Sequence, residues 1–206
     1  MRKLIRKLSD MRGISGFEYR LTDRIADMFK KYCDDVKIDS LGSVIAVKRC
    51  NKPNAPKLMI EAHCDEIGLI VTSITDEGYL TFANVGGVDE RTLPSTEVTV
   101  HGKEDLWGVI GIKPNYLLEQ GKTAKLKELA VDTGLSAEKV KKLAAVGDST
   151  TLAQSVGRLG KKQFSGKSLD DRASVAAIMR VMKNIKDLDI DIDVYAVAAV
   201  QEEVGC

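Results

Sequence analysis

KLMIEAHCDEIG, residues 57–68, is the stretch that decides the fold of this chain. Its first six residues are mostly apolar and predict a short buried strand. The strand ends on His63 and Asp65, and the pattern of the chain changes directly after Gly68. Helical and extended segments alternate before this point, whereas the residues from about 68 to 160 are mostly β-like. We therefore place a domain boundary between residues 67 and 68.

The chain before this strand predicts two helices and a hairpin. Apolar residues at helical spacing predict helices over residues 2–12 and about 18–32. Two apolar runs, residues 36–38 and 43–48, flank the turn sequence DSLG at residues 39–42, which is typical of a β-hairpin.

The middle of the chain predicts a second kind of domain. Short β-like stretches, separated by turn residues, cover residues 69–74, 79–83, 97–100 and 106–112, and one helical segment covers about 136–145. This pattern is typical of a separate, small, mostly β domain.

After residue 160 the α/β pattern returns. Asp170 begins a predicted helix that extends to about Ile185, and residues 191–199 predict a strand that is apolar on both faces, as in the centre of a covered sheet. The simplest architecture is an α/β domain formed by residues 1–67 and 160–206. A barrel-like β insert, residues 68–159, interrupts it.

Composition excludes several classes of protein. The chain has 206 residues, of which 44% are hydrophobic and 30% charged, with a net charge of +1, so no basic excess indicates nucleic acid. Its basic start is not followed by the apolar region of a secretory signal, and its longest apolar run is too short to cross a membrane. The four cysteines lack CxxC or zinc-ribbon spacing, which indicates reduced thiols in a cytoplasmic protein.

Three clusters carry residues suited to chemistry, and the first is at His63. In an extended strand His63 and Asp65 point to the same side. A neutral imidazole is a good metal ligand, and a nearby carboxylate can hold its other ring nitrogen. The alternative is a hydrogen-bonded histidine at a strand end without metal.

The other two clusters are pairs of acids. Asp170 and Asp171 precede a helix, where carboxylates also cap free N–H groups and complement the helix dipole. Glu202 and Glu203 follow an apolar strand, and ligand sites in open α/β sheets lie at the carboxyl ends of strands. A solvated turn is the alternative for this second pair.

The three clusters together are stronger evidence for a metal site than any one of them alone. Carboxylates held together repel one another unless a cation lies among them, so folding of the three clusters into one place predicts a divalent metal site. His101, in the β insert, is interpreted as a surface histidine. The sequence has no phosphate-binding glycine loop and no GxSxG nucleophile elbow.

Three motifs occur in order along the chain: HCDEIG at 63–68, LDDR at 169–172 and QEEVG at 201–205. Together they resemble the glutamyl aminopeptidase and TET aminopeptidase family of co-catalytic, di-metal metallopeptidases, clan MH. The resemblance extends to SGFE at residues 15–18, GVIG with Lys113 and Pro114 after residue 107, and VGD at 146–148. It therefore covers nearly the whole chain.

The resemblance implies a fold and roles for residues. The fold is a three-layer α/β sheet with helices on both faces, of the phosphorylase/hydrolase-like zinc-peptidase type, with a β-barrel-like insert that shapes the substrate pocket and takes part in dodecameric assembly. His63, Asp170 and Glu203 correspond to metal ligands, with Asp170 bridging two divalent ions, zinc or cobalt. Asp65 corresponds to the carboxylate that supports the histidine, and Glu202 to the general base.

The implied activity is metal-dependent release of N-terminal amino acids from peptides. Family members continue beyond the Glu-Glu motif and supply a further aspartate and histidine, one to each metal. By that pattern the catalytic domain is C-terminally truncated, and we expect weak metal binding and little turnover from these 206 residues. Two alternatives stay open: an inactive paralogue that joins oligomers, and an endoglucanase-type glycoside hydrolase.

Overall fold

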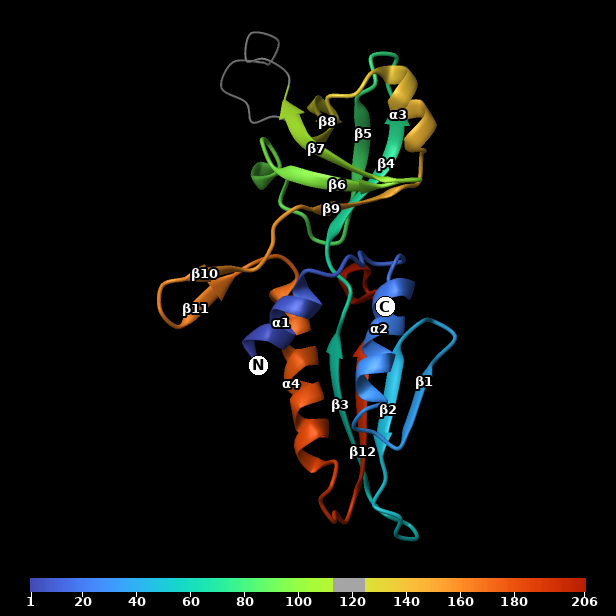
Figure 1. The fold of residues 1–206 in the computed structure, drawn as a ribbon. Helices are drawn as coiled ribbons and strands as arrows, with labels where there is room; N and C mark the ends of the chain where they lie inside the picture. The colour runs from blue at the N-terminus through green and yellow to red at the C-terminus, as the bar shows by residue number, and fades with distance from the viewer. Residues whose placement is uncertain (113–124) are drawn as a thin grey trace. The chain divides into compact units, whose positions relative to one another are not determined.

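The computed structural model describes residues 1–112 and 125–206, so Lys113 and Pro114 of the resemblance lie outside the described residues. The chain divides into two compact units (Figure 1). Unit 1 consists of Met1–Glu66 and Ser155–Cys206, and unit 2 consists of Ile67–Gln154. The first division lies one residue before the boundary expected at 67/68, and the second lies five residues before the boundary expected at 159/160.

Unit 1 is built around a four-stranded mixed sheet. Its order is β1 (Asp35–Ile38), β2 (Val44–Lys48), β12 (Asp193–Ala199) and β3 (Lys57–His63). β12 pairs in parallel with β3 and antiparallel with β2, and β1 and β2 form the predicted hairpin. In the hairpin turn, Asp39 Oδ1 accepts the backbone N–H groups of Leu41, Gly42 and Ser43. This carboxylate adds to the backbone hydrogen bonds of the turn, in which Gly42 N–H donates to the Asp39 carbonyl and Asp39 N–H to the Ser43 carbonyl.

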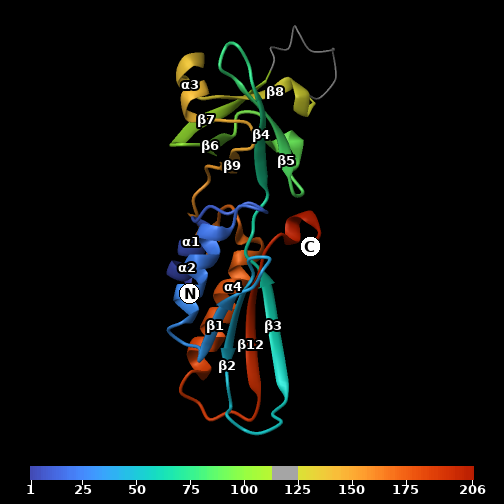
Figure 2. The same cartoon turned by 90° about the vertical axis from the view of Figure 1, so that its right-hand side faces the viewer.

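Three helices pack on this sheet. They are α1 (Arg2–Ser9), α2 (Tyr19–Phe29) and α4 (Leu169–Ile185), each within a few residues of its predicted range. Their buried side chains share one apolar core with alternate residues of the strands, such as Val44, Ala196 and Ala198. Figure 2 shows α1, α2 and α4 on the same side of the strands.

The strand over residues 57–62 is present, but it is not buried as predicted. β3 is an edge strand in the described sheet, with β12 as its neighbour, and Leu58 and Met59 are exposed. β12 is central, yet its burial alternates, so one of its faces is covered and the other is half-buried. Among the described residues, the helices thus cover one face of the sheet.

Unit 2 is a closed six-stranded antiparallel barrel in the order β4-β5-β8-β7-β6-β9. The strands are β4 (Gly68–Ile74), β5 (Leu80–Val85), β6 (Glu97–His101), β7 (Asp105–Ile112), β8 (Leu129–Asp132) and β9 (Ser149–Leu152), with helix α3 (Ala137–Leu143) and the 3-10 turns η1 (Glu90–Thr92) and η3 (Leu126–Glu128) between them. Inward-facing residues such as Leu69, Val98 and Ile110 form its own core. The predicted barrel-like character is confirmed.

Two features of the barrel were not predicted. β8 and β9 have four residues each, and the STTL sequence of β9 is too polar to indicate a buried strand. His101 is not a surface residue, because its side chain is only 9% exposed and its ring nitrogens contact Asp105 and Thr151, each at 2.9 Å. Pairing of β6 with β9 brings Thr151 beside it.

A short hairpin, β10 (Gly157–Leu159) and β11 (Gln163–Ser165), precedes α4 in unit 1, and the 3-10 turn η4 (Glu202–Val204) follows β12. No helix in the described ranges is both long and apolar enough to cross a bilayer.

Candidate metal centre

The candidate centre lies in unit 1, where β3 and β12 end. The two strands run in parallel and in register, with Ala199 opposite His63. The residues that follow β12, Glu202 and Glu203, therefore reach the level of His63, as expected for carboxyl ends of parallel neighbours. Gln201, in the left-handed region with φ 62°, turns the chain back toward β3.

Four of the predicted residues lie together here, three from the ends of the paired strands and Asp170 from the start of α4. Ligand atoms of His63, Glu202 and Glu203 all lie within 4.8 Å of one another. Asp170 Oδ1 lies 3.2 Å from His63 Nε2, and Glu202 Oε2 lies 3.7 Å from the same nitrogen. The side chains of Asp170 and Glu202 are 91% and 58% exposed, so this group opens to solvent.

Asp65, the fifth predicted residue, lies beneath the group and is fully buried. Its Oδ1 accepts the N–H group of Glu202 at 3.2 Å, and its Oδ2 accepts that of Glu203 at 3.1 Å and the hydroxyl of Ser15 at 2.6 Å. Asp65 thereby fixes the turn that carries both glutamates.

Asp65 also lies beside the histidine ring. Its Oδ1 is 3.3 Å from His63 Nδ1, close enough for an ion pair, but the direction does not meet hydrogen-bond geometry, and Nδ1 is buried without a hydrogen bond. The contact is therefore electrostatic in the described structure. It leaves Nε2 as the ring nitrogen that faces Asp170 and Glu202.

The electrostatics of the group favour a cation. Burial acts to lower the pKa of His63, but the hydrogen bond to Asp170 and the charges of Asp65 and Glu202 outweigh it, and the pKa is raised. Burial raises the pKa of Glu203, helped by the charges of Asp65, Glu202 and Asp170 against the opposing His63. An imidazole with several carboxylates is a donor set suited to zinc, cobalt or manganese, so the residues fit a divalent metal.

Asp170 reaches His63 from the first turn of α4, which is irregular. Ser168 is left-handed with φ 56°, Asp170 and Asp171 have non-helical backbone angles, and the peptide bond between them is cis. The hydrogen bond of the Asp170 carboxylate in the described residues is to His63 and not to a helix N–H group. Among the described contacts, the Asp170 carboxylate therefore does not act as a helix cap.

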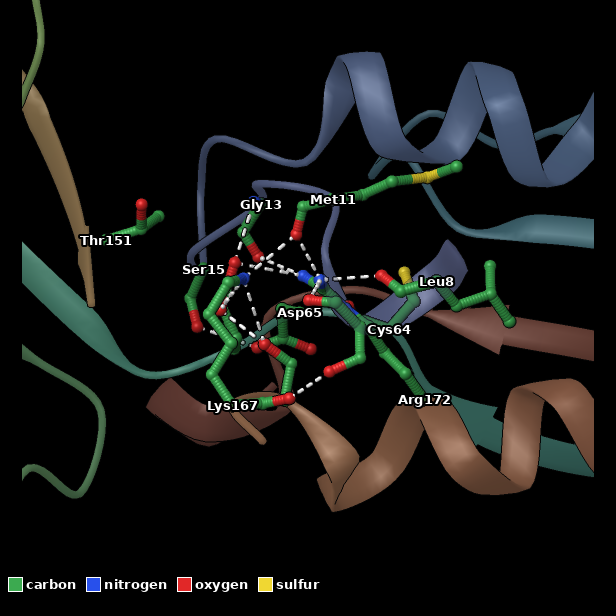
Figure 3. A network of polar contacts seen from close by, with 12 residues as sticks. Leu8, Met11, Gly13, Ser15, Cys64, Asp65, Thr151, Lys167 and Arg172 are labelled. Carbon is green, nitrogen blue, oxygen red and sulfur yellow. Dashed lines mark hydrogen bonds and ion pairs between the residues drawn. The ribbon is translucent and has the colours of Figure 1, made fainter. Parts of the chain in front are cut away.

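Three charged residues around the centre were missed. Glu66 forms an ion pair with Lys167 and another with Arg172, and Figure 3 shows Lys167 and Arg172 within the polar network around Asp65. One available signal was the spacing of Arg172, which lies three, four and seven residues before Val175, Ala176 and Met179 on the buried side of α4. A charge at a core position of a helix indicates a buried partner.

Comparisons with known proteins agree with this geometry. Residues 42–206 match the model of the M42 glutamyl aminopeptidase family. The chain is 35% identical to the lysyl aminopeptidase of Pyrococcus furiosus over 98% of its own length and 60% of that relative. It spans about three fifths of the length of these curated relatives, among them a putative aminopeptidase of Acetivibrio thermocellus.

Solved structures share the fold. Aminopeptidase APDkam598 from the archaeon Desulfurococcus kamchatkensis is 37% identical with a TM-score of 0.91, over 98% of this chain and 56% of that one. A TET1 structure solved as a dodecamer, PhTET1-12s, is 35% identical with a TM-score of 0.87, over 100% of this chain and 61% of that one.

Proposed function

The chain belongs to the M42 glutamyl aminopeptidase family, and from this premise we propose that it forms the metal-holding part of a metal-dependent aminopeptidase. The family drawn from the three sequence motifs is confirmed by the match over residues 42–206. The activity proposed is release of N-terminal amino acids from peptides. The observation that carries it is the group of His63, Asp170, Glu202 and Glu203 at one end of the sheet.

We assign three residues to metal binding. His63 and Asp170 would hold one divalent ion, and Asp170 and Glu203 a second, with zinc or cobalt as the expected metals. The open, acidic group supports this assignment, because it combines an imidazole with carboxylates that repel one another in the absence of a cation. Bound divalent ions supply Lewis acidity, which makes water more acidic and polarises a carbonyl.

Glu202 is the proposed general base. Its carboxylate is 58% exposed, it lies at the edge of the group, and its backbone is held by Asp65. A carboxylate so placed can take a proton from an attacking water and deliver it to the leaving amine. Asp65 is proposed to support this step by fixing the turn and by lying beside the His63 ring.

The barrel, unit 2, is proposed to shape the substrate pocket and to contribute to a homo-oligomer. A relative at 35% identity is a dodecamer, which supports an assembly of that kind. The free thiols of Cys33, Cys50, Cys64 and Cys206 agree with a reducing compartment, and a cytoplasmic location is part of the proposal.

The test separates metal binding from turnover. Cobalt is titrated into the chain and into His63→Ala, Asp170→Asn and Glu202→Gln, and each sample is assayed on amino-acid p-nitroanilides with and without chelator. We expect the first two variants to lose cobalt affinity by more than about tenfold. We expect Glu202→Gln to keep most of the affinity and to lose whatever metal-dependent hydrolysis the parent has.

Other outcomes would favour the alternatives. Cobalt affinity unchanged in His63→Ala would overturn the metal assignment. Co-assembly with a full-length relative without added activity would favour an inactive subunit. Cleavage of a cellulosic substrate that survives chelation would favour a glycoside hydrolase, which the family match does not support and which leaves His63 without a role.

A further inference from the structure

Two consecutive buried carboxylates, Asp65 and Glu66, end the segment that carries His63, and they contact different parts of the centre. Asp65 holds the turn with Glu202 and Glu203. Glu66 is 3% exposed, and its contacts go instead to the segment around Asp170. One strand end therefore organises both other segments of the candidate centre.

The two oxygens of Glu66 hold opposite flanks of Asp170. Oε2 accepts from Lys167 Nζ at 2.7 Å and from the hydroxyl of Ser168, on the N-terminal side of Asp170. Oε1 accepts from Arg172 Nη2 at 3.2 Å, on the C-terminal side, and from the N–H group of Gly13 at 3.1 Å.

Both cations are anchored to the protein at a second place. Arg172 is fully buried and donates to the carbonyl oxygens of Leu8, Ser9, Met11, Gly13 and Cys64. Lys167 Nζ donates to the carbonyl oxygen of Met11 at 3.0 Å, and its own carbonyl accepts from the Ser9 hydroxyl. The segment 167–172 is thus attached to the loop after α1 and to the end of β3.

Asp170 itself has little else to fix it. Its side chain is 91% exposed, and the hydrogen bond that the described residues offer its carboxylate is the one to His63. Its backbone angles are non-helical, so the regular hydrogen bonds of α4 do not determine its direction. The buried contacts on both flanks are what remains to set where this carboxylate points.

We propose that Glu66 is a positioning residue, which fixes Asp170 from both flanks and so sets the affinity of the centre for divalent metal. This inference rests on the proposed function, because Asp170 is assigned as a metal ligand only there. Among the described residues, the Glu66 carboxylate has no hydrogen bond or ion pair with His63, Asp170 or Glu203, so it acts through Lys167, Ser168 and Arg172. Because Glu66 and Arg172 are buried and the Lys167 side chain is 10% exposed, salt screens these contacts much less than surface pairs.

The variants are Glu66→Gln, which removes the charge from both flanks, and Lys167→Met, which removes only the ion pair on the N-terminal flank and leaves the contacts of Glu66 with Ser168 and Arg172. Met182→Ala is the matched control, because Met182 is fully buried near the other end of α4 and lowers stability without touching the network. Each is titrated with cobalt under conditions where it is folded. Hydrogen–deuterium exchange is measured on the metal-free proteins.

We expect Glu66→Gln to weaken cobalt binding about 10- to 100-fold, Lys167→Met to weaken it less, and Met182→Ala to leave it within about twofold. In metal-free protein, exchange should quicken in peptides covering 167–176 in both network variants and stay unchanged in 200–206. A general loss of stability would quicken both regions alike. If Glu66→Gln does not fold, the cobalt affinity and hydrogen exchange of Lys167→Met alone test the proposal.

Unchanged cobalt affinity in the folded network variants would overturn the proposal, and so would unchanged exchange over 167–176. A parent chain that binds no cobalt would count against the proposed function instead. In that case the exchange data, which need no metal, still decide whether Glu66 fixes the segment around Asp170.

Discussion

The carboxylate of Asp65 accepts the backbone N–H group of Glu203 at 3.1 Å, across 138 positions of sequence. The same carboxylate accepts the N–H group of Glu202 and lies beside the His63 ring. A fully buried side chain thus connects the ends of two parallel strands at the point where the candidate ligands meet.

Asp65→Asn tests this connection. An amide keeps one acceptor oxygen but places an NH₂ group against one of the two backbone N–H donors, and it removes the charge beside His63. We expect a loss of about 1–3 kcal/mol in unfolding free energy and about a tenfold or larger loss of cobalt affinity. Chemical denaturation and cobalt titration measure the two effects.

Ser15→Ala is the control for Asp65→Asn, because it removes only the hydroxyl that donates to Asp65 Oδ2. Its effect on cobalt affinity should be smaller. Equal affinities in Asp65→Asn and the parent would show that this carboxylate does not organise the centre.

Arg172→Met tests the buried cation. The substitution leaves Glu66 with one cation fewer and removes one hydrogen bond from each of five backbone carbonyls. Removal of one member of a buried ion pair leaves the other charge buried without compensation. We therefore expect about 3–5 kcal/mol of destabilisation in urea denaturation. Arg91→Met, which breaks the exposed pair with Asp89, is the control and should leave the unfolding midpoint in place. A midpoint equally unaffected in Arg172→Met would refute a structural role for the network.

The buried thiol of Cys64 should make the unfolding free energy of unit 1 decrease with rising pH in the alkaline range. Burial raises the pKa of this thiol from 9.0 to about 12. A raised native pKa stabilises the fold below pH 9.0, and this contribution is lost as pH rises toward 12, because the unfolded chain releases its proton first. The unfolding free energy of the parent should therefore fall more steeply above pH 9.0 than that of Cys64→Ala, by up to about 1.4 kcal/mol per pH unit.

Denaturation of both proteins between pH 8 and about pH 10.5 measures this difference in slope. Cys206→Ala, at an exposed cysteine, is the control and should follow the parent. Parallel curves for the parent and Cys64→Ala would contradict the burial argument.

Gly102→Ala tests the packing of the barrel in unit 2. A Cβ atom at this position would lie 2.2 Å from the carbonyl oxygen of Leu143 and 2.9 Å from Asp148 Oδ2, at the end of α3. Because these groups are backbone or held in a turn, we expect about 1–3 kcal/mol of destabilisation, with faster hydrogen exchange confined to residues 67–154. Gly87→Ala, where no atom lies within 4 Å, should behave like the parent.

The sequence by itself predicted the mixed α/β fold, the barrel-like insert and the family. Helix α4 could be recognised from its apolar spacing, and the hairpin of β1 and β2 from the turn that Asp39 closes. His63, Asp65, Asp170, Glu202 and Glu203 could be singled out because three motifs in order resemble one family, although each pair of acids alone also fits a helix cap or a solvated turn. Local patterns carry this information, since periodicity and turn residues are properties of neighbours in sequence.

Only the tertiary structure decided which of these residues meet. The parallel pairing of β3 with β12 sets Glu202 and Glu203 level with His63, and no local pattern fixes the partner or register of a parallel strand. The same holds for Glu66, whose bonds to Lys167 and Arg172 span more than a hundred residues. The sequence analysis assigned no role to Glu66, and its burial beside two cations becomes visible only in the folded chain.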